Sequence, residues 1–313
     1  MKKYANFSIV IPVYNEEKNI RILGAAISNA LKKFRAYEVI FVDDGSTDNT
    51  QAEILNLKSK DSSVDLIRFR RNFGKSAALA AGFKRAKGKV IITMDGDLQD
   101  DPSDIPRFLE KIDEGYDLVV GWKEKKYRGY NIKIIPSKAY NILTRYFTDM
   151  KLHDFDCPFK AFRKNVASGL YIYGELHRYI PVLVNQKGFK IGEIKVKNLS
   201  RVHGQSKFNS TRILKGFLDL ITVLFLTRFA KRPLHFFGSI GLILLLLGFI
   251  LGLFLVIKRF IFGILIVQEE EVFILLTILF TILGVQFISL GLISEMLVYL
   301  NQMKKDENAP KEE

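Results

Sequence analysis

The chain of 313 residues has only one cysteine, Cys157, and this scarcity excludes a fold held together by internal disulfides. A single cysteine is typical of proteins that stay in a reducing compartment. The N-terminal stretch also lacks an apolar run of signal-peptide length before Pro12, so we expect the polar part of the chain to remain unexported. What the chain has in excess is positive charge, with 47 basic against 33 acidic residues, and hydrophobic residues, at 48%.

Two long runs near the C-terminus lack charge altogether. Phe236–Ile257 is 22 residues long and Val272–Ser294 is 23 residues long. As a helix, each run is long enough to cross a hydrocarbon core of about 30 Å. A buried core helix is the alternative for one such run, but two adjacent runs rich in Leu, Ile, Phe and Gly favour membrane spans.

The charge balance predicts how these spans are oriented. Of the basic and acidic residues, 42 and 25 lie within residues 1–235, which gives that part a net charge of +17. Positive charge beside a span favours the cytoplasmic side, and two spans bring the chain back to that side. We therefore expect a multi-pass protein of the cell membrane (inner or plasma membrane), with the large polar domain and both termini in the cytoplasm.

The segment before the first span is amphipathic. Within residues 211–234, Ile213, Phe217, Leu220 and Leu224 recur at near-helical spacing, and basic residues stand at both ends. This pattern is typical of a helix that lies among lipid headgroups. A helix that packs on the polar domain is the alternative, and one helix can do both.

A positive net charge of +14 also raises nucleic acid as a partner. We expect no nucleic acid here, because the basic residues are scattered and no nucleic-acid-binding motif occurs. The densest basic stretch, Lys123 to Lys133, has the composition of a solvated loop.

The polar part of the chain alternates strand and helix patterns. Four apolar strands are predicted, ending near Pro12, near Val42, near Phe69 and near Met94, and each is followed by a helical pattern. Such alternation predicts an α/β fold with a predominantly parallel sheet covered by helices on both faces. Ligands bind beyond the carboxyl ends of the strands in such sheets.

Acidic residues gather at those strand ends. Asp43 and Asp44 follow one strand, and Asp95 and Asp97 follow another within the stretch VIITMDGDLQDDP. An isolated Asp-Gly-Asp reads as a turn, but several carboxylates brought to one crevice repel one another unless a cation lies between them. Oxygen ligands completed by substrate phosphates point to Mg²⁺ or Mn²⁺ and to a substrate with a diphosphate.

A nucleotide-binding P-loop is the rival interpretation, because Gly74-Lys75-Ser76 is present. That motif requires a glycine five residues before Gly74, and this position is Phe69. The motif therefore fails, although the amides of this stretch can still meet an anion at a helix N-terminus.

Five stretches, in register, carry a family resemblance: IVIPVYNEEKNI, VIFVDDGSTDNT, RNFGKSAALAAGFKRAKG, VIITMDGDLQDDP and RVHGQSKFN. Together they resemble glycosyltransferase family 2 with the GT-A (Rossmann-like) fold. More narrowly, they resemble the polyprenyl-phosphate sugar transferases, which include dolichyl-phosphate mannose synthase and bacterial undecaprenyl-phosphate glucosyltransferases. The resemblance covers roughly residues 6–210, and the two spans match the bacterial members.

The resemblance implies roles for individual residues. The residues expected to bind the nucleotide sugar are Pro12, Tyr14, Glu16, Val42, Asp44, Asp95, Gly96, Asp97 and Gln99. Asp97 is expected to be the main metal ligand, with Asp95 on the nucleotide or the metal. Arg201 and Lys207 are expected to close over the donor diphosphate. The residues expected to grip the acceptor phosphate are Lys123, Lys133, Ser137 and Lys138.

The reaction itself explains why no base is required. A phosphate monoester, with a second pKa of about 6, is mostly dianionic at neutral pH and can attack the anomeric carbon directly. Catalysis then rests on positioning and on neutralising the leaving diphosphate. Relatives carry an Asp near Asp154 and Asp156 that is discussed as a base. We expect Asp154 to orient the acceptor or the sugar instead.

The resemblance divides the chain into a GT-A catalytic domain at 1–210, an amphipathic juxtamembrane segment at 211–234, a two-span domain at 235–300 and a cytoplasmic tail at 301–313. It implies an inverting transferase that moves a hexose, from UDP-glucose or a UDP-N-acetylhexosamine, to undecaprenyl phosphate. Three alternatives stay open: GDP-mannose as the donor, a different acceptor, and a catalytically silent membrane scaffold. The partners expected besides the substrates are a flippase, a downstream glycosyltransferase or a second copy of the chain.

Reporter fusions test the predicted orientation. A fusion after Lys304 is expected to read as cytoplasmic and a tag within residues 261–268 as external, because the net positive charge holds residues 1–235 inside. A tail that is accessible from outside the cell would show that one apolar run is not a span.

Overall fold

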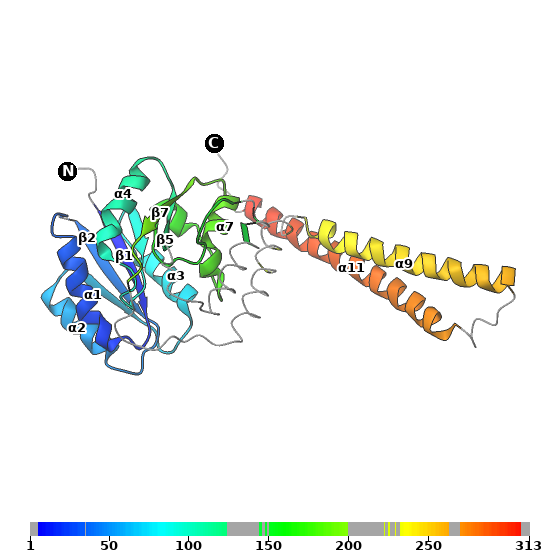
Figure 1. Ribbon diagram of the computed structural model, residues 1–313, viewed down its shortest axis with the longest axis horizontal. Coiled ribbons are helices and arrows are strands. Elements are labelled where there is room, and N and C mark those ends of the chain that lie inside the picture. The colour runs from blue at the N-terminus through cyan, green and yellow to red at the C-terminus, as the bar shows by residue number, and fades with distance from the viewer. Residues whose placement is uncertain are drawn as a thin grey trace, which may run out of the picture. The chain divides into compact units, whose positions relative to one another are not determined.

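The structure is a computed structural model that describes residues 6–34, 36–123, 144–145, 148, 150–199, 222, 225, 229, 232–262 and 270–307. The chain separates into two compact units, Met1–Val223 and Leu224–Glu313. The first unit holds a sheet with helices, and the second holds two long apolar helices (Figure 1).

The first unit is built on one seven-stranded sheet with the order β3-β2-β1-β4-β6-β5-β7. Every neighbouring pair is parallel except those that involve β6, which runs antiparallel to both β4 and β5. The strands are β1 (Phe7–Val13), β2 (Tyr37–Asp43), β3 (Val64–Arg68), β4 (Val90–Thr93), β5 (Leu118–Lys123), β6 (Lys160–Arg163) and β7 (Ile191–Val196). The predicted α/β fold with a predominantly parallel sheet is confirmed.

Helices cover both faces of this sheet (Figure 1). They are α1 (Glu17–Ala30), α2 (Thr50–Lys60), α3 (Lys75–Arg85), α4 (Ile105–Asp113), α6 (Lys164–Ser168) and α7 (Ile180–Gln186), with single 3₁₀ turns η1 (Pro102–Asp104) and η2 (Leu176–Tyr179). Helix α1 ends at Ala30, where the chain leaves helical geometry and turns towards β2.

The central strands are apolar because both of their faces are covered. All residues of β1 except Pro12 are buried, and β2 is buried from Val39 onwards. The one polar side chain within β1, Ser8, is satisfied by donating to Glu38 at 2.5 Å and accepting from the Gly88 N–H at 2.8 Å. The core therefore buries no unpaired hydroxyl at this position.

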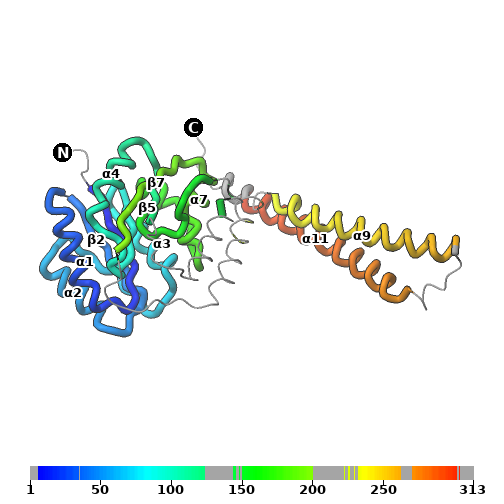
Figure 2. The backbone as a smooth tube through the Cα atoms, viewed as in Figure 1, coloured from blue at the N-terminus to red at the C-terminus, as the bar shows by residue number. Residues whose placement is uncertain are grey.

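Strand register brings the carboxyl ends together. Val13 lies opposite Asp43, and Asp43 lies opposite Arg68, so β1, β2 and β3 end at one level. The chain following β4 is bound to the same edge through the Met94 N–H, which donates to the Val10 carbonyl at 3.3 Å. The backbone path of the first unit is drawn as a smooth tube in Figure 2. The convergence predicted from the sequence is confirmed.

The second unit is an antiparallel pair formed by α9 (Pro233–Phe262) and α11 (Glu271–Glu307). The two helices approach closely at glycines: a Cβ added to Gly241 would lie 2.7 Å from the Gly284 carbonyl oxygen. Small residues at such seams are typical of helices that pack inside membranes.

The outward faces of these helices are apolar and exposed. Phe249 is 68% exposed and Leu242 63%, whereas a core helix of a soluble protein buries such side chains. Both helices are long and apolar enough to cross a membrane, over Pro233–Ile261 and Glu271–Asn301. They contain the two predicted runs, and they are candidate membrane spans.

Candidate active site

A cleft of ≈ 330 Å³ opens beyond the carboxyl edge of the sheet. Seven of the residues predicted to bind a nucleotide sugar line it: Pro12, Tyr14, Glu16, Asp44, Asp95, Gly96 and Asp97. Val42 is buried inside β2 and does not line the cleft. Gln99 lies two residues beyond Asp97 and donates its backbone N–H to that carboxylate at 3.2 Å.

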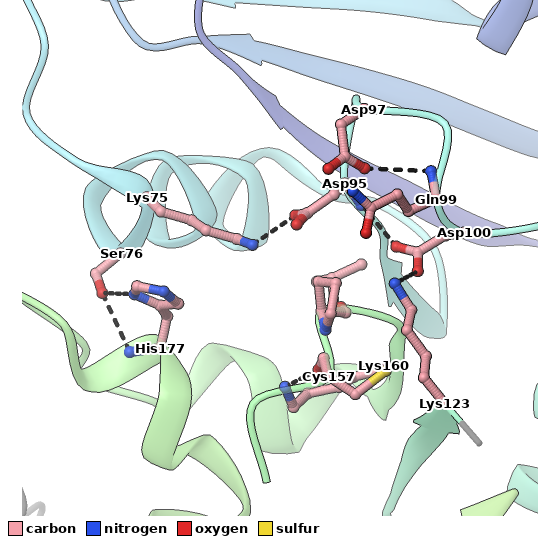
Figure 3. A network of polar contacts seen from close by, with 12 residues as sticks. Lys75, Ser76, Asp95, Asp97, Gln99, Asp100, Lys123, Cys157, Lys160 and His177 are labelled. Carbon is pink, nitrogen blue, oxygen red and sulfur yellow. Dashed lines mark hydrogen bonds and ion pairs between the residues drawn. The ribbon is translucent and has the colours of Figure 1, made fainter. Parts of the chain in front are cut away.

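Close packing and backbone hydrogen bonds fix the conformation of the Asp95–Asp97 turn. Gly96 is required because a Cβ there would lie 2.7 Å from a methyl group of Val13. Leu98 adopts a positive φ of 64°, and the Asp95 N–H donates to the Asp100 carboxylate at 2.9 Å. The turn therefore holds both carboxylates in place on the wall of the cleft (Figure 3).

Lys75 neutralises the first of these carboxylates. Its ammonium lies 2.5 Å from Asp95 Oδ1. Burial alone would raise the pKa of Asp95, but the Lys75 ammonium, together with the charges of Lys123 and Lys160, outweighs that effect and lowers it. The same pair raises the pKa of Lys75 against the effect of its burial. Lys75 was not among the predicted site residues, although the Gly74-Lys75-Ser76 stretch that contains it was noticed.

Asp44 anchors the loop that delivers Lys75. Its carboxylate accepts from the backbone N–H of Phe73 at 2.7 Å and of Gly74 at 2.9 Å. Gly74 has a φ of +91°, which favours glycine, and α3 begins directly after it. Asp44 thus fixes the start of α3 relative to the end of β2, and its predicted contact with the nucleoside stays a prediction.

Lys123, predicted to grip the acceptor phosphate, lies in a buried ion pair. Its ammonium is 2.6 Å from Asp100 Oδ1, and Asp100 is 1% exposed. Burial disfavours the charged lysine, but Asp100 outweighs this and raises the lysine pKa. Burial in turn raises the pKa of Asp100 against the opposing effect of Lys123. A role in binding the acceptor would require this pair to open.

The predicted Asp154 and Asp156 lie on the loop before β6. The Asp156 N–H donates to Asp154 Oδ1 at 3.2 Å, and the Asp154 N–H donates to Glu193 at 3.2 Å. The Asp156 carboxylate is 3.7 Å from the Arg178 guanidinium. Asp156 lines a small pocket behind the cleft, which shares Lys75 and Asp95 with it.

The remaining predicted residues, Lys133, Ser137, Lys138, Arg201 and Lys207, lie outside the residues that the structure describes. Their roles at the acceptor phosphate and the donor diphosphate stay predictions.

A metal ion fits the donor set of the turn. Within the described ranges, no group of three or more His, Cys, Asp or Glu residues could hold an ion by itself. Magnesium is commonly held by one or two carboxylates with phosphate oxygens completing the shell. Asp97 and Asp95, adjacent on the wall of a cleft large enough for a nucleotide's diphosphate, match that arrangement.

Comparisons with known proteins agree with this geometry. The family model described as "Glycosyl transferase family 2" matches residues 8–170. The chain is 38% identical to "Dodecaprenyl-phosphate galacturonate synthase" of Rhizobium johnstonii over 77% of this chain and 75% of the relative. It is 35% identical to "Undecaprenyl-phosphate 4-deoxy-4-formamido-L-arabinose transferase" of Pseudomonas aeruginosa over 96% of this chain and 87% of the relative.

A solved structure shares the fold. Glucosyl-3-phosphoglycerate synthase from Mycobacterium tuberculosis, in complex with Mn²⁺, uridine diphosphate and glucosyl-3-phosphoglycerate, matches with a TM-score of 0.55 and 19% sequence identity. The match covers 71% of this chain and 79% of that chain.

The buried pair of Lys123 and Asp100 gives a stability prediction. Lys123→Met is expected to lower the free energy of unfolding by about 3–5 kcal/mol, because it leaves the Asp100 carboxylate buried without a contacting cation. Adding Asp100→Asn should recover much of that loss. Urea unfolding of the full chain, followed by fluorescence of the single tryptophan, Trp122, measures the change.

The matched control is Lys111→Met, which removes an exposed pair with Glu114 and should cost about 1 kcal/mol or less. Equal effects of the two single substitutions would contradict the role given to the buried pair.

Proposed function

Because the chain belongs to glycosyl transferase family 2, we propose that it is a membrane-bound inverting transferase that moves a hexose from a nucleotide diphosphate sugar to a polyprenyl phosphate. The product is a polyprenyl-phosphate sugar and the leaving group is a nucleoside diphosphate. The observation that carries the proposal is the Asp95–Asp97 turn, which places two carboxylates on the wall of a cleft at the carboxyl edge of the sheet.

The acceptor is proposed from two sources. The names of both relatives specify a polyprenyl phosphate, and the chain covers 75% and 87% of their lengths. The chain also has two candidate membrane spans, which would keep it beside a lipid substrate. Undecaprenyl phosphate is the acceptor we propose, with the catalytic unit on the cytoplasmic side.

The donor is proposed to carry UDP. The sequence resemblance favours glucose or an N-acetylhexosamine, while the relatives' names specify galacturonate and 4-deoxy-4-formamido-L-arabinose. The names of these two relatives thus differ in the sugar and in the length of the polyprenol, and both specify a polyprenyl phosphate. GDP-mannose is the alternative donor.

The described residues would act mainly by holding charge. A divalent cation, Mg²⁺ or Mn²⁺, would supply Lewis-acid neutralisation of the leaving diphosphate. Asp97 would hold that cation, with Asp95 beside it. Lys75, at the N-terminus of α3, places a further positive charge on the same side of the cleft. Neutralisation of developing charge in a preorganised site is the largest catalytic effect available here.

The acceptor phosphate needs no base from the protein, because its dianion is the nucleophile. Asp154 and Asp156 would orient the sugar or the acceptor from the loop before β6. Arg201 and Lys207 would close over the diphosphate, and Lys133, Ser137 and Lys138 would hold the acceptor. One in-line displacement inverts the anomeric centre.

An assay of lipid-linked product tests this function. Membranes that contain the protein, given undecaprenyl phosphate and a panel of radiolabelled nucleotide sugars, should form a lipid-linked sugar from at least one donor. Asp97→Ala should lower that rate by about 10²-fold or more, because it removes the main proposed holder of the cation. Asp113→Ala, an exposed carboxylate at the end of α4, is the control and should leave the rate unchanged. Near-normal turnover of Asp97→Ala at saturating magnesium would contradict the proposal that Asp97 holds the cation.

The pH dependence of the rate tests whether the reaction proceeds without a general base from the protein. If the phosphate dianion attacks, the rate should rise with pH around the second phosphate pKa of about 6 and then level off. Asp154→Asn and Asp156→Asn should lower the rate through misplacement while keeping the acid limb at the same pH. Initial rates measured across pH 5–8 decide the matter. Disappearance of the acid limb in either variant would show that the residue's own ionisation sets the rate.

A further inference from the structure

A small enclosed pocket lies directly behind the cleft. Its volume is ≈ 10 Å³, and it shares Pro12, Lys75 and Asp95 with the cleft. A space of this size holds about one water molecule. It is too small for a sugar ring or a phosphate, so a ligand in the cleft can place only the tip of one small substituent there.

The walls of this pocket combine apolar side chains with four charged side chains and a histidine, and they come from distant segments. Lys75 belongs to α3, Asp95 follows β4, Lys160 begins β6 and His177 lies in η2. Figure 3 shows these elements bringing the side chains around one space beside Asp95. The remaining acidic wall residue is Asp156.

Both carboxylates of the pocket lie near a cation, whereas one of its cations has no carboxylate in contact. Asp95 is held by Lys75 at 2.5 Å, and Asp156 lies 3.7 Å from Arg178. Lys160 is only 3% exposed, and in the part of the chain that the structure describes its ammonium donates to a neutral group, the Cys157 carbonyl, with no carboxylate oxygen within 4.0 Å. Lys160 is therefore a buried cation without a contacting anion, which is costly to maintain.

Burial accordingly lowers the pKa of Lys160. An anion brought within contact of this ammonium would reverse that effect and gain a charge-assisted hydrogen bond.

His177 adds a second donor to the pocket. Its backbone N–H donates to Ser76 Oγ at 3.2 Å, and the same Oγ lies 3.0 Å from His177 Nδ1. When the Ser76 hydroxyl donates to Nδ1, the neutral ring carries its hydrogen on Nε2, and the protonated ring carries one there as well. In these two states His177 has a donor on Nε2.

We propose that this pocket receives one carboxylate oxygen of a nucleotide-linked hexuronate, an inference that rests on the transferase function proposed above and specifies its donor. Lys160 binds the carboxylate and His177 donates to it. A neutral hexose would place a hydroxymethyl group in the same space and leave Lys160 without an anion. Sites that bury an unmatched polar group reject the analogue that lacks its partner.

Donor binding in the absence of lipid tests this proposal. Calorimetry on the purified full chain with Mn²⁺ should show UDP-glucuronate or UDP-galacturonate binding about tenfold or more tighter than the matching neutral UDP-hexose, as expected for a hydrogen bond between charged groups. Lys160→Met should bring the two affinities together. The fold should survive, because replacing a buried charge with an apolar side chain of similar size is often neutral.

Lys164→Met, an exposed lysine four residues further along, is the matched control and should keep the wild-type preference. His177→Ala should weaken uronate binding more than hexose binding. Equal binding of uronate and hexose by the wild-type chain, or a preference unchanged in Lys160→Met, would overturn the proposal.

Failure of the proposed function gives a different result. A chain that binds no nucleotide sugar would contradict the proposal that the donor is a nucleotide sugar. A chain that binds the uronate donor more tightly but forms no lipid-linked product would contradict the proposed acceptor and would still support the uronate pocket.

Discussion

The site depends on one electrostatic constraint: carboxylates gathered at the edge of a sheet need positive charge close by. Asp95, Asp97 and Asp100 lie within six residues at the end of β4. Lys75 meets the first and Lys123 the last, at 2.5 Å and 2.6 Å. Because the Asp100 carboxylate also accepts from the Asp95 N–H, its pairing with Lys123 supports the shape of the turn. The proposed cation would complete this neutralisation at Asp97.

The same constraint explains why distant segments meet here. Asp44 fixes the loop that starts α3, and α3 carries both Lys75 and Ser76. Ser76 in turn holds His177, which is 101 residues away in the sequence. The strands β1, β2 and β4 supply a rigid edge, and the charged groups are set on turns that this edge supports. The proposed substrates, a diphosphate donor and a phosphate acceptor, are anions that such a preorganised arrangement can bind.

Much of the fold could be predicted from the sequence, because alternating strand and helix patterns and two uncharged runs are local signals. The convergence of Pro12, Asp44 and Asp95 followed from strand ends alone. Lys160 and His177 were missed, because a lysine in a four-residue strand reads as a surface residue and its burial arises only when β6 inserts antiparallel between β4 and β5. Lys123 was recognised as important, but its pairing with Asp100 across the fold gives no sequence signal.

Attack by a lipid phosphate on the anomeric carbon, in one displacement, is the central claim. The anomeric configuration of the isolated lipid product tests it most directly, by NMR of the sugar-phosphate linkage formed from an α-linked nucleotide donor. The account predicts a β-linked sugar phosphate as the product, since a single displacement inverts the centre. An α-linked sugar phosphate would contradict the account, because a single in-line displacement cannot retain the configuration of the anomeric centre.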